Sequence, residues 1–471
     1  MSENSTSSRI AEVAIIGAGP SGLAAATRLA KAGLTPVVFD LNASPGGQVY
    51  RQVETPQADL RVTGIDYRLG QRMVEAFRRS RVDYRPDSRV WWVQRVDAGF
   101  ELGVLHEGRS AVWRARRLIL CHGAMERPFP FPGWQLPGVM TAGAAQVLLK
   151  QGGLLPEDAP ILVGSGPLIY LLGWQYLQAG RPPTCILDLT PRHQWRLPLR
   201  QPVKAWHARG YLFKGLKMML ALKRAGVAIE RDIDALEAIG DKVLEQIRYR
   251  QRGHWKQRPA SLLLSHVGVV PETHLTRSLG LTHRWHAEQQ SFLPVRDDTL
   301  SADENLWVVG DGAAIGGAAN AMREGTLSAL EVVASHHGLT KEERHERDGL
   351  RRERARDLCA RQLLDAMFLP PLNIDAMPEE TIICRCEALT RGDLDQAISD
   401  GAEGPNQLKA FTRCGMGPCQ GRQCSLNATL LLSRRLAQTP DQIGQWQIRP
   451  PVQTITLGEL ATSSMVENRA T

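Results

Sequence analysis

The sequence predicts an α/β protein with two dinucleotide-binding (Rossmann-like) domains and a small cysteine-rich domain near the C-terminus. Three observations predict this architecture: a glycine fingerprint directly after an apolar run at residues 13–22, a second and incomplete fingerprint at residues 161–169, and five cysteines between residues 384 and 424. The chain has 471 residues, a length that allows two or three domains.

The first fingerprint carries the strongest prediction. Residues 13–16 form an apolar run typical of a buried parallel strand, and three glycines follow with the spacing G-x-G-x-x-G. These glycines permit the tight turn, the approach of a pyrophosphate and the close packing of the next helix, expected over residues 21–32. A second strand over residues 36–39 ends where a ribose-binding carboxylate is expected. The predicted dinucleotide-binding residues of this unit are Gly17, Ala18, Gly19, Pro20, Ser21, Gly22 and Asp40.

Composition and charge exclude several classes of protein. The formal net charge is +8, but the basic residues are scattered and no basic run carries interleaved aromatic residues, so we expect no nucleic-acid partner. Residues 1–11 lack the apolar segment of a secretory signal. The longest uncharged stretch, residues 159–180, is interrupted by glycine and proline. We therefore expect a cytoplasmic protein without a membrane span, which a partner could bring to a membrane.

The segment after the first unit adds further candidate residues. Adjacent glycines in Gly46-Gly47-Gln48 allow this loop to lie flat against a planar ligand, although an ordinary turn would have the same composition. We expect a helix over residues 69–79 and a small antiparallel sheet, followed by a buried strand over residues 117–121 that leads to Gly123. The strands expected in the antiparallel sheet are residues 89–95, 101–105 and 110–113.

A second nucleotide fold begins with a strand at residues 161–163 and ends with Asp188 at the close of the next strand. Its turn has two of the three glycines, and Ile169 stands in the third position, where a side chain pushes the helix away from the strand. Binding of NAD, binding of another nucleotide or flavin, and a structural remnant therefore remain open. If a nicotinamide cofactor binds, Asp188 favours one with a free 2′-hydroxyl.

A return segment supplies the second part of the first site. An apolar strand within residues 300–309 leads to Gly310 and Asp311, and a helix is expected from about residue 316. A flavin dinucleotide is too long to be held by one fingerprint, and a distal carboxylate can bind its ribityl hydroxyls. The pair of motifs predicts FAD rather than NAD at the first site, although Asp311 would also suit a turn before a helix.

The cysteine cluster predicts a metal centre. Thiolates bind iron or zinc, and a [2Fe-2S] cluster needs four of them. We predict the ligands Cys384, Cys386, Cys419 and Cys424, because the glycine-rich hinge around Cys419 suits a ligand loop better than Cys414 does. A structural zinc is the alternative.

Several motifs resemble those of a known family. The first unit, the Gly-Gly-Gln loop and residues 118–124 resemble flavoproteins with two dinucleotide domains, although Cys121-His122-Gly123 replaces their usual Ala-Thr-Gly. Residues 126–143 are similar to the α (FAD-binding) subunits of heteromeric amino-acid dehydrogenases and oxidases, such as opine oxidase, hydrogen cyanide synthase and dye-linked proline or hydroxyproline dehydrogenase. The cysteine region resembles the [2Fe-2S] domain of the bacterioferritin-associated ferredoxin (BFD) type.

The resemblance implies a glutathione-reductase type of fold and a redox function without a catalytic residue of its own. It implies an FAD- and [2Fe-2S]-containing oxidoreductase subunit for CH–NH or CH–NH₂ donors, which receives electrons from a catalytic flavoprotein β subunit. A further partner implied by the resemblance is a small ferredoxin-like subunit. The alternatives are a stand-alone NADH-dependent reductase and an assembly scaffold with structural FAD and zinc.

The expected domain boundaries follow the motifs. A C-terminal arm from residue 449 is expected to dock on a partner chain. The expected segments are the FAD-binding domain (1–150 and 296–340), the second nucleotide-binding-like domain (151–295), a charged helical linker (341–375), the [2Fe-2S] domain (376–435) and the arm (436–471).

Overall fold

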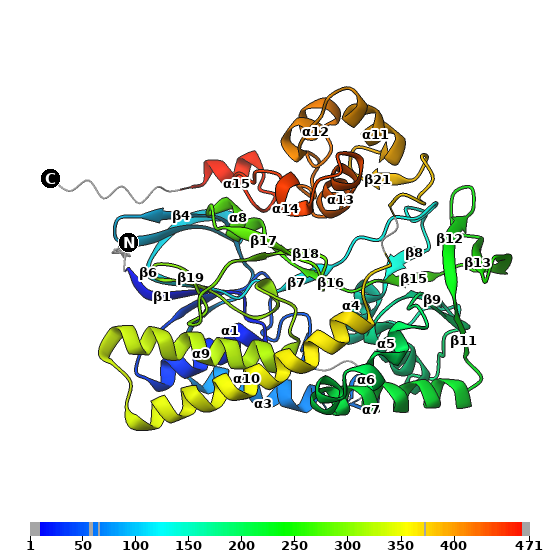
Figure 1. Cartoon of the computed structure of the whole chain (residues 1–471). Coiled ribbons are helices and arrows are strands. Elements are labelled where there is room, and N and C mark those ends of the chain that lie inside the picture. The colour runs from blue at the N-terminus through cyan, green and yellow to red at the C-terminus, as the bar shows by residue number, and fades with distance from the viewer. Residues whose placement is uncertain (1–9, 56–59, 65, 372–373, 464–471) are drawn as a thin grey trace.

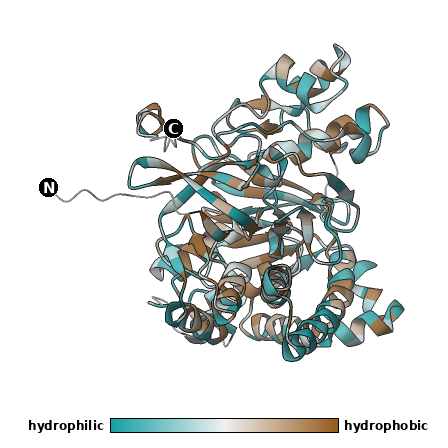
Figure 2. Ribbon diagram, turned by 90° about the vertical axis from the view of Figure 1, so that its left-hand side faces the viewer, coloured by the Kyte–Doolittle hydropathy of each residue, from teal (hydrophilic) through white to brown (hydrophobic). Residues whose placement is uncertain are grey.

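The computed structural model describes residues 10–55, 60–64, 66–371 and 374–463. Residues 1–9, within the stretch that lacks a secretory-signal pattern, and residues 464–471 of the expected arm lie outside the described residues. Figure 1 shows two sheets side by side, long helices along the lower edge and the cysteine-rich elements at the top. Figure 2 shows hydrophobic residues along the central strands and both hydrophobic and hydrophilic residues on the surrounding helices.

The first sheet positions the predicted dinucleotide site. Its strand order is β19-β20-β6-β1-β2-β3, and every neighbouring pair except β19–β20 is parallel. Ile16 pairs with both Phe39 and Leu120, and Leu120 pairs with Val308, so four strands end at the same edge. The strands are β1 (Ala11–Ile16), β2 (Val37–Phe39), β3 (Asp83–Arg85), β6 (Arg109–Leu120), β19 (Ser301–Asp303) and β20 (Leu306–Val308).

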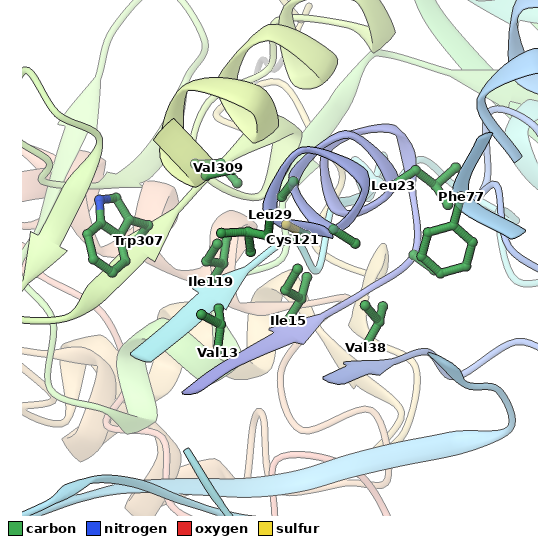
Figure 3. Packing of buried hydrophobic residues seen from close by; sticks show 14 of the residues in the cluster. Val13, Ile15, Leu23, Leu29, Val38, Phe77, Ile119, Cys121, Trp307 and Val309 are labelled. Atoms are coloured by element: carbon green, nitrogen blue, oxygen red, sulfur yellow. The ribbon is translucent and has the colours of Figure 1, made fainter. Parts of the chain in front are cut away.

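Helices α1 (Pro20–Lys31), α3 (Asp66–Arg79) and α9 (Ala318–His337) contribute to the apolar core on one face of this sheet. Figure 3 shows Leu23 and Leu29 of α1 above Ile15 of β1 and Ile119 of β6. These four side chains are almost completely buried, so the glycine turn between β1 and α1 is held by packing on both sides.

The opposite face carries an antiparallel sheet of β4 (Ser88–Val96), β5 (Gly99–His106) and the first half of β6. The two strands expected at residues 110–113 and 117–121 are one continuous strand, β6. Its first half pairs with β5 and its second half with β1. The basic residues in the middle do not interrupt it, because Arg114 and Arg117 are paired with Glu101 and Glu12.

The second domain is a parallel sheet with the order β11-β10-β9-β15-β8. Helices cover one face and a three-stranded antiparallel sheet the other, as the two apolar clusters on alternate sides of β9 show. Short strands β7 (Ala124–Glu126) and β16 (Val269–Pro271) pair where the chain leaves and re-enters the first domain. The elements are β8 (Val139–Thr141), β9 (Ile161–Gly164), β10 (Cys185–Asp188), β11 (Ala228–Arg231), β15 (Leu263–His266), α4 (Ala142–Gly152), α5 (Pro167–Gln178), α6 (Leu197–Arg200), α7 (Pro202–Arg224), β12 (Ile233–Ile239), β13 (Gln246–Gln251) and β14 (His254–Pro259).

The charged segment after α9 forms one helix, α10 (Lys341–Met367), which is longer than the charged run itself. Thr340 and Glu343 form a capping box at its start. Arg28 of α1 is buried and paired with Glu343 and Glu346, so this helix is fixed to the first domain. Its last turns bury Leu363 and Met367 against α7.

The cysteine-rich region has its own small core, made by β21 (Ile382–Cys384), α11 (Arg391–Ser399), α12 (Pro405–Thr412), α13 (Ser425–Arg435) and the residues that follow. Trp446 fills its centre and donates to Pro405 O. The region is joined to the second domain, because Trp134 Nε1 donates to Ile382 O at 2.7 Å.

The described part of the C-terminal arm packs on the first domain of its own chain, and its docking on a partner stays a prediction. Val452 is buried, and its backbone N–H donates to Trp91 O of β4 at 2.8 Å. Arg89 of the same strand donates to Thr454 O. Strand β4 is an edge strand with unpaired backbone groups, and the arm of the same chain covers them. Helix α15 (Leu457–Ala461) follows and lies near β6.

In the part of the chain that the structure describes, no helix combines the length and apolar character needed to cross a lipid bilayer.

We expect Val452→Asp to release the arm, because a carboxylate at this site has no partner and the valine loses about 1.5–3 kcal/mol of burial. The variant should be cleaved within the arm much faster in limited proteolysis. Leu457→Asp is the matched control, because Leu457 is 85% exposed. Equal cleavage rates in both variants would show that the arm does not depend on this contact.

Candidate cofactor site and cysteine cluster

A cavity of about 400 Å³ lies at the edge where β1, β2, β6 and β20 end. The loops from these four strand ends, together with the Gly-Gly-Gln loop, form much of its wall. The structure therefore brings together residues from the two ends of the first domain. The predicted cofactor residues that line the cavity are Gly17, Gly19, Pro20, Ser21, Asp40, Gly47, Gln48, Gly123 and Asp311.

The glycine turn presents backbone at the cavity. Helix α1 starts directly after Gly19, and the N–H groups of its first turn have no intrahelical acceptor, as at every helix start. The second glycine loop lies close to this turn, because a Cβ on Gly47 would lie 2.8 Å from Gly19 Cα. This arrangement makes a narrow backbone cradle suited to a phosphate group.

The other four predicted residues support the cavity from behind. A Cβ on Gly22 would lie 1.8 Å from Gly17 O, so only glycine allows this contact between helix and turn. Ala18 O accepts from Gly46 N at 2.8 Å. Gly310 N donates to Glu324 at 2.9 Å. Sequence patterns did not distinguish these supporting positions from lining ones, because both require small residues.

Asp40 is held at the end of β2 by polar neighbours. Its carboxylate accepts from the backbone N–H of Ala18 and from both the backbone and the side chain of Asn42, at 2.7 and 2.9 Å for the latter two. Burial raises the pKa of this carboxyl, and the hydrogen bonds act against that rise. Asn42 also lines the cavity and was missed in the sequence, although its position two residues after an acid is typical of a local side-chain turn.

Asp311 approaches the cavity from the return segment. Its Oδ1 accepts from Gly316 N and Gly317 N, both at 2.9 Å, just before α9. Burial raises the pKa of Asp311. These bonds fix one carboxylate oxygen at the helix start and direct the side chain to the cavity.

A buried ionic cluster holds this return loop in place. Glu324 of α9 is almost fully buried and accepts from Gly310 N, Arg296 and Arg354, each at 2.9 Å. Burial acts to raise the pKa of Glu324, but the two guanidinium groups outweigh it and hold the pKa below its usual value. The loop with Gly310 and Asp311 is therefore positioned by charged residues that are far apart in the sequence.

Cys121 and His122 directly follow the end of β6. Cys121 is buried, and burial raises the pKa of its thiol to about 12, which favours the protonated form. His122 is also buried, and it lines the cavity beside Glu272. Burial lowers the pKa of His122, which favours the neutral imidazole.

Glu272 connects the cavity to the cysteine-rich region. It lies 2.6 Å from His274 Nδ1 and 3.4 Å from Arg422. Burial acts to raise its pKa, but these neighbours lower the pKa to about 2, so Glu272 is ionised. His274 Nε2 lies 2.9 Å from Gln420 O, the residue after Cys419. The sequence contained no motif for this connection, because its residues come from three segments.

Five cysteines converge in two groups. The sulfur atoms of Cys384, Cys414 and Cys424 lie within 4.8 Å of one another, and all three residues are buried. Cys386 and Cys419 are more exposed and lie beside each other. Two of the predicted ligands, Cys384 and Cys424, thus lie in the buried group, and the other two, Cys386 and Cys419, lie in the more exposed group. Cys414, expected to be spare, belongs to the buried group as well.

Local backbone geometry explains this placement. Arg413 adopts a left-handed conformation (φ 64°) that ends α12 and turns Cys414 inward. The following glycine loop packs tightly, because a Cβ on Gly417 would lie 2.2 Å from Cys386 Cβ. Hydrogen bonds from Cys414 and Cys424 lower the pKa of Cys384, which favours its thiolate, the form that binds metals.

The second nucleotide fold is closed around its own acid. Asp188 is fully buried and accepts from Tyr170 at 2.7 Å and from Arg231 and Thr190 N at 3.0 Å. The glycine turn packs against His266, whose backbone oxygen would lie 1.6 Å from a Cβ on Gly164. Three interpretations of this fold were open: binding of NAD, binding of another nucleotide or flavin, and a structural remnant. These contacts favour the structural remnant.

A larger cavity of about 890 Å³ lies between the two domains. It shares Gln48, Val49, Ala124 and Val269 with the first cavity, so the two adjoin. Burial lowers the pKa of Lys150, at its wall, to about 8. Sequence reasoning did not find this cavity, because its lining comes from many separate segments.

The chain matches two family models. Residues 11–325 match the pyridine nucleotide-disulphide oxidoreductase model, and residues 379–464 match the sarcosine oxidase A3 domain. An opine oxidase subunit from Agrobacterium tumefaciens is 37% identical over 460 residues, covering 96% of this chain and 91% of that protein. Hydrogen cyanide synthase subunit HcnB of Pseudomonas aeruginosa is 32% identical over 448 residues, covering 87% and 90%.

Solved structures agree with the predicted fold. L-proline dehydrogenase from P. horikoshii superposes with a TM-score of 0.71 at 17% identity, covering 96% of this chain and 79% of that one. Thioredoxin reductase of T. acidophilum superposes with a TM-score of 0.53 at 16% identity, covering 69% of this chain and 98% of that one. The predicted two-dinucleotide-domain fold with a cysteine-rich addition is thereby confirmed, as is the predicted resemblance. The chain belongs to the pyridine nucleotide-disulphide oxidoreductase family, contains a match to the sarcosine oxidase A3 domain, and is related to HcnB and to this opine oxidase subunit.

Proposed function

We propose that this chain is the FAD- and [2Fe-2S]-containing electron-transfer subunit of a heteromeric amino-acid, imino-acid or opine dehydrogenase. It relays electrons from a catalytic flavoprotein subunit to an external acceptor. The observation that carries the proposal is the connection of the cavity to the cysteine loop through Glu272 and His274. This connection keeps the cavity and the cysteine loop in a fixed relative position, which electron transfer between two bound redox groups would require.

The residues around the first cavity fit FAD. The start of α1 and the two glycine loops offer backbone N–H groups for a pyrophosphate, and Asp40 and Asp311 offer carboxylates at separate places along the cavity wall. FAD, when bound, supplies the ability to take up an electron pair and release single electrons. The protein holds the two ends of the cofactor through loops whose positions the sheet register fixes.

The four predicted cysteines suit a [2Fe-2S] cluster. Cys384 and Cys424, on the buried side, would offer two sulfurs to one iron, and Cys386 and Cys419, nearer the surface, would offer two to the other. An external acceptor can approach the more exposed pair. Cys414 lies within 4.8 Å of the sulfur atoms of Cys384 and Cys424, and the serine substitutions below test whether it is a ligand.

Relatives suggest the partner. Two of the similar proteins are named as subunits, of opine oxidase and of hydrogen cyanide synthase, so both act within multi-subunit enzymes. We propose that the amine is oxidised on a partner flavoprotein of the amino-acid oxidase type, and that a further component is a small ferredoxin-like subunit. This division of labour accounts for a cavity lined by cofactor-binding groups without an assigned catalytic base.

NADH should not reduce the flavin of this protein. The alternative function, an NADH-dependent reductase, needs an open second nucleotide site, whereas Asp188 is enclosed by Tyr170, Arg231 and Thr190. Anaerobic mixing with NADH should leave the visible flavin absorption unchanged over minutes, and dithionite should bleach it. Rapid bleaching by NADH would contradict the proposal.

Replacing Asp311 should weaken FAD binding. Loss of a hydrogen bond to a charged group costs about 1.5–3 kcal/mol, so Asp311→Ala should bind FAD at least ~tenfold more weakly. The readout is flavin per chain after dialysis. Asp303→Ala is the control, because that carboxylate is about half exposed and lies away from the cavity. Equal flavin content in both variants would show that Asp311 does not contribute to FAD binding.

Serine substitutions identify the metal ligands. Cys384→Ser, Cys386→Ser, Cys419→Ser and Cys424→Ser should each lower iron content and the visible absorption of the cluster, whereas Cys414→Ser should retain both. The measurement is iron and zinc per chain in anaerobically purified protein. Retention of iron by Cys419→Ser and its loss in Cys414→Ser would show that Cys414 is a ligand. Stoichiometric zinc without iron in the unmodified protein would show that the cysteines form a structural zinc site and not an iron–sulfur cluster.

A further inference from the structure

Helices α6 and α7 expose an unusual number of large apolar side chains. Leu199 is 85% exposed, Phe213 70% and Val203 69%. Within α7, separations of three, four and seven residues place Val203, Phe213 and their exposed apolar neighbours on one side of the helix, and Leu199 lies on the short helix α6 directly before it. We call this set the α7 stripe: Leu199, Val203, Trp206, Phe213, Leu216 and Leu220.

The other side of α7 is already packed. Ala208 and Leu222 are fully buried, and the helix contacts α5 and α10. A surface helix normally buries its apolar side and exposes its polar side, whereas α7 carries a second set of apolar side chains in contact with water. Covering the α7 stripe with a second surface would therefore be favourable, because its apolar side chains would leave water.

The charge around the stripe indicates the nature of that surface. Residues 189–229 contain nine lysines and arginines and no aspartate or glutamate. Some of these cations lie directly beside the apolar side chains, as Arg209 does over the Trp206 ring at 4.5 Å. Apolar residues on one side of a helix, with lysine and arginine beside them and no acidic residue, are typical of helices that lie in the headgroup region of a membrane.

The position of the segment also suits a membrane surface. Figure 1 shows α6 and α7 at the lower edge of the molecule, on the side away from α11–α13 of the cysteine-rich region. A bilayer against this edge leaves the cysteine loop accessible to other proteins. Lys214, Lys217 and Met218 of the same helix line the larger cavity, so this cavity adjoins the same edge.

We propose that α6 and α7 bind the surface of an anionic lipid bilayer. The α7 stripe enters the boundary between headgroups and acyl chains, and the surrounding lysines and arginines contact lipid phosphates. The attachment is peripheral and belongs to this chain itself, so it does not require a partner.

The test is co-sedimentation of the purified full chain, with its bound cofactors, with vesicles of phosphatidylglycerol or of phosphatidylcholine. The protein should bind phosphatidylglycerol vesicles, bind phosphatidylcholine vesicles much more weakly, and lose binding as salt is raised. Phe213→Gln combined with Leu216→Gln should weaken binding at least ~tenfold, because two apolar side chains no longer enter the bilayer.

Phe411→Gln is the matched control, because Phe411 is 56% exposed but lies on α12 of the cysteine-rich region. It should leave vesicle binding unchanged, and all variants should keep the flavin content and melting temperature of the unmodified protein. Absence of binding to phosphatidylglycerol vesicles would overturn the proposal. It would also be overturned if the double variant bound vesicles normally but no longer retained a co-purifying subunit, because the stripe would then be a protein interface.

Discussion

The parallel register of β1, β2, β6 and β20 is the constraint on which the rest of the structure depends. Ile16, Phe39, Leu120 and Val308 are aligned across four strands, so the residues that follow them emerge at one edge. Motifs nearly three hundred positions apart are brought to one cavity by backbone hydrogen bonds alone. Ligands of open α/β sheets bind at the carboxyl ends of strands for this reason.

Two groups of charged side chains then hold the loops at this edge of the sheet in place. Glu324 holds the return loop through Gly310 and two arginines, and Glu272 lies between the cavity and the cysteine loop with His274 and Arg422. Glu324 is almost fully buried and Glu272 is partly buried, and each carboxylate would destabilise the fold without an arginine beside it. The two clusters therefore bind the separate redox regions of the chain into one unit.

The parts of the site that rest on local sequence were predictable. The β1–α1 turn, Asp40 and the return strand carry signals within a few residues, and the structure places most of them at the cavity. The remaining features depend on residues far apart in the chain. The sequence showed that Asp188 ends a strand, but its burial depends on Arg231 from another strand. The contact of the C-terminal arm with the edge of β4 was not predicted, because nothing in the sequence of the arm specifies that strand.

The cysteine cluster shows the same limit. Five thiols in two loops indicated a metal centre, but the inward turn of Cys414 depends on a left-handed residue at the end of α12. Similarly, the charge of α10 suggested a solvated linker, whereas its length and its pairing with Arg28 make it part of the first domain. Pattern and spacing identified the chemistry, and tertiary contacts determined which residues of each motif carry it.

The central claim is that one chain holds a flavin and an iron–sulfur cluster that exchange electrons. Anaerobic titration of the purified protein with dithionite, followed by visible absorption and electron paramagnetic resonance, tests it most directly. The account predicts uptake of one electron more than the flavin alone accepts, with a paramagnetic signal from the reduced cluster. Uptake equal to that of the flavin alone, with no such signal, would contradict it.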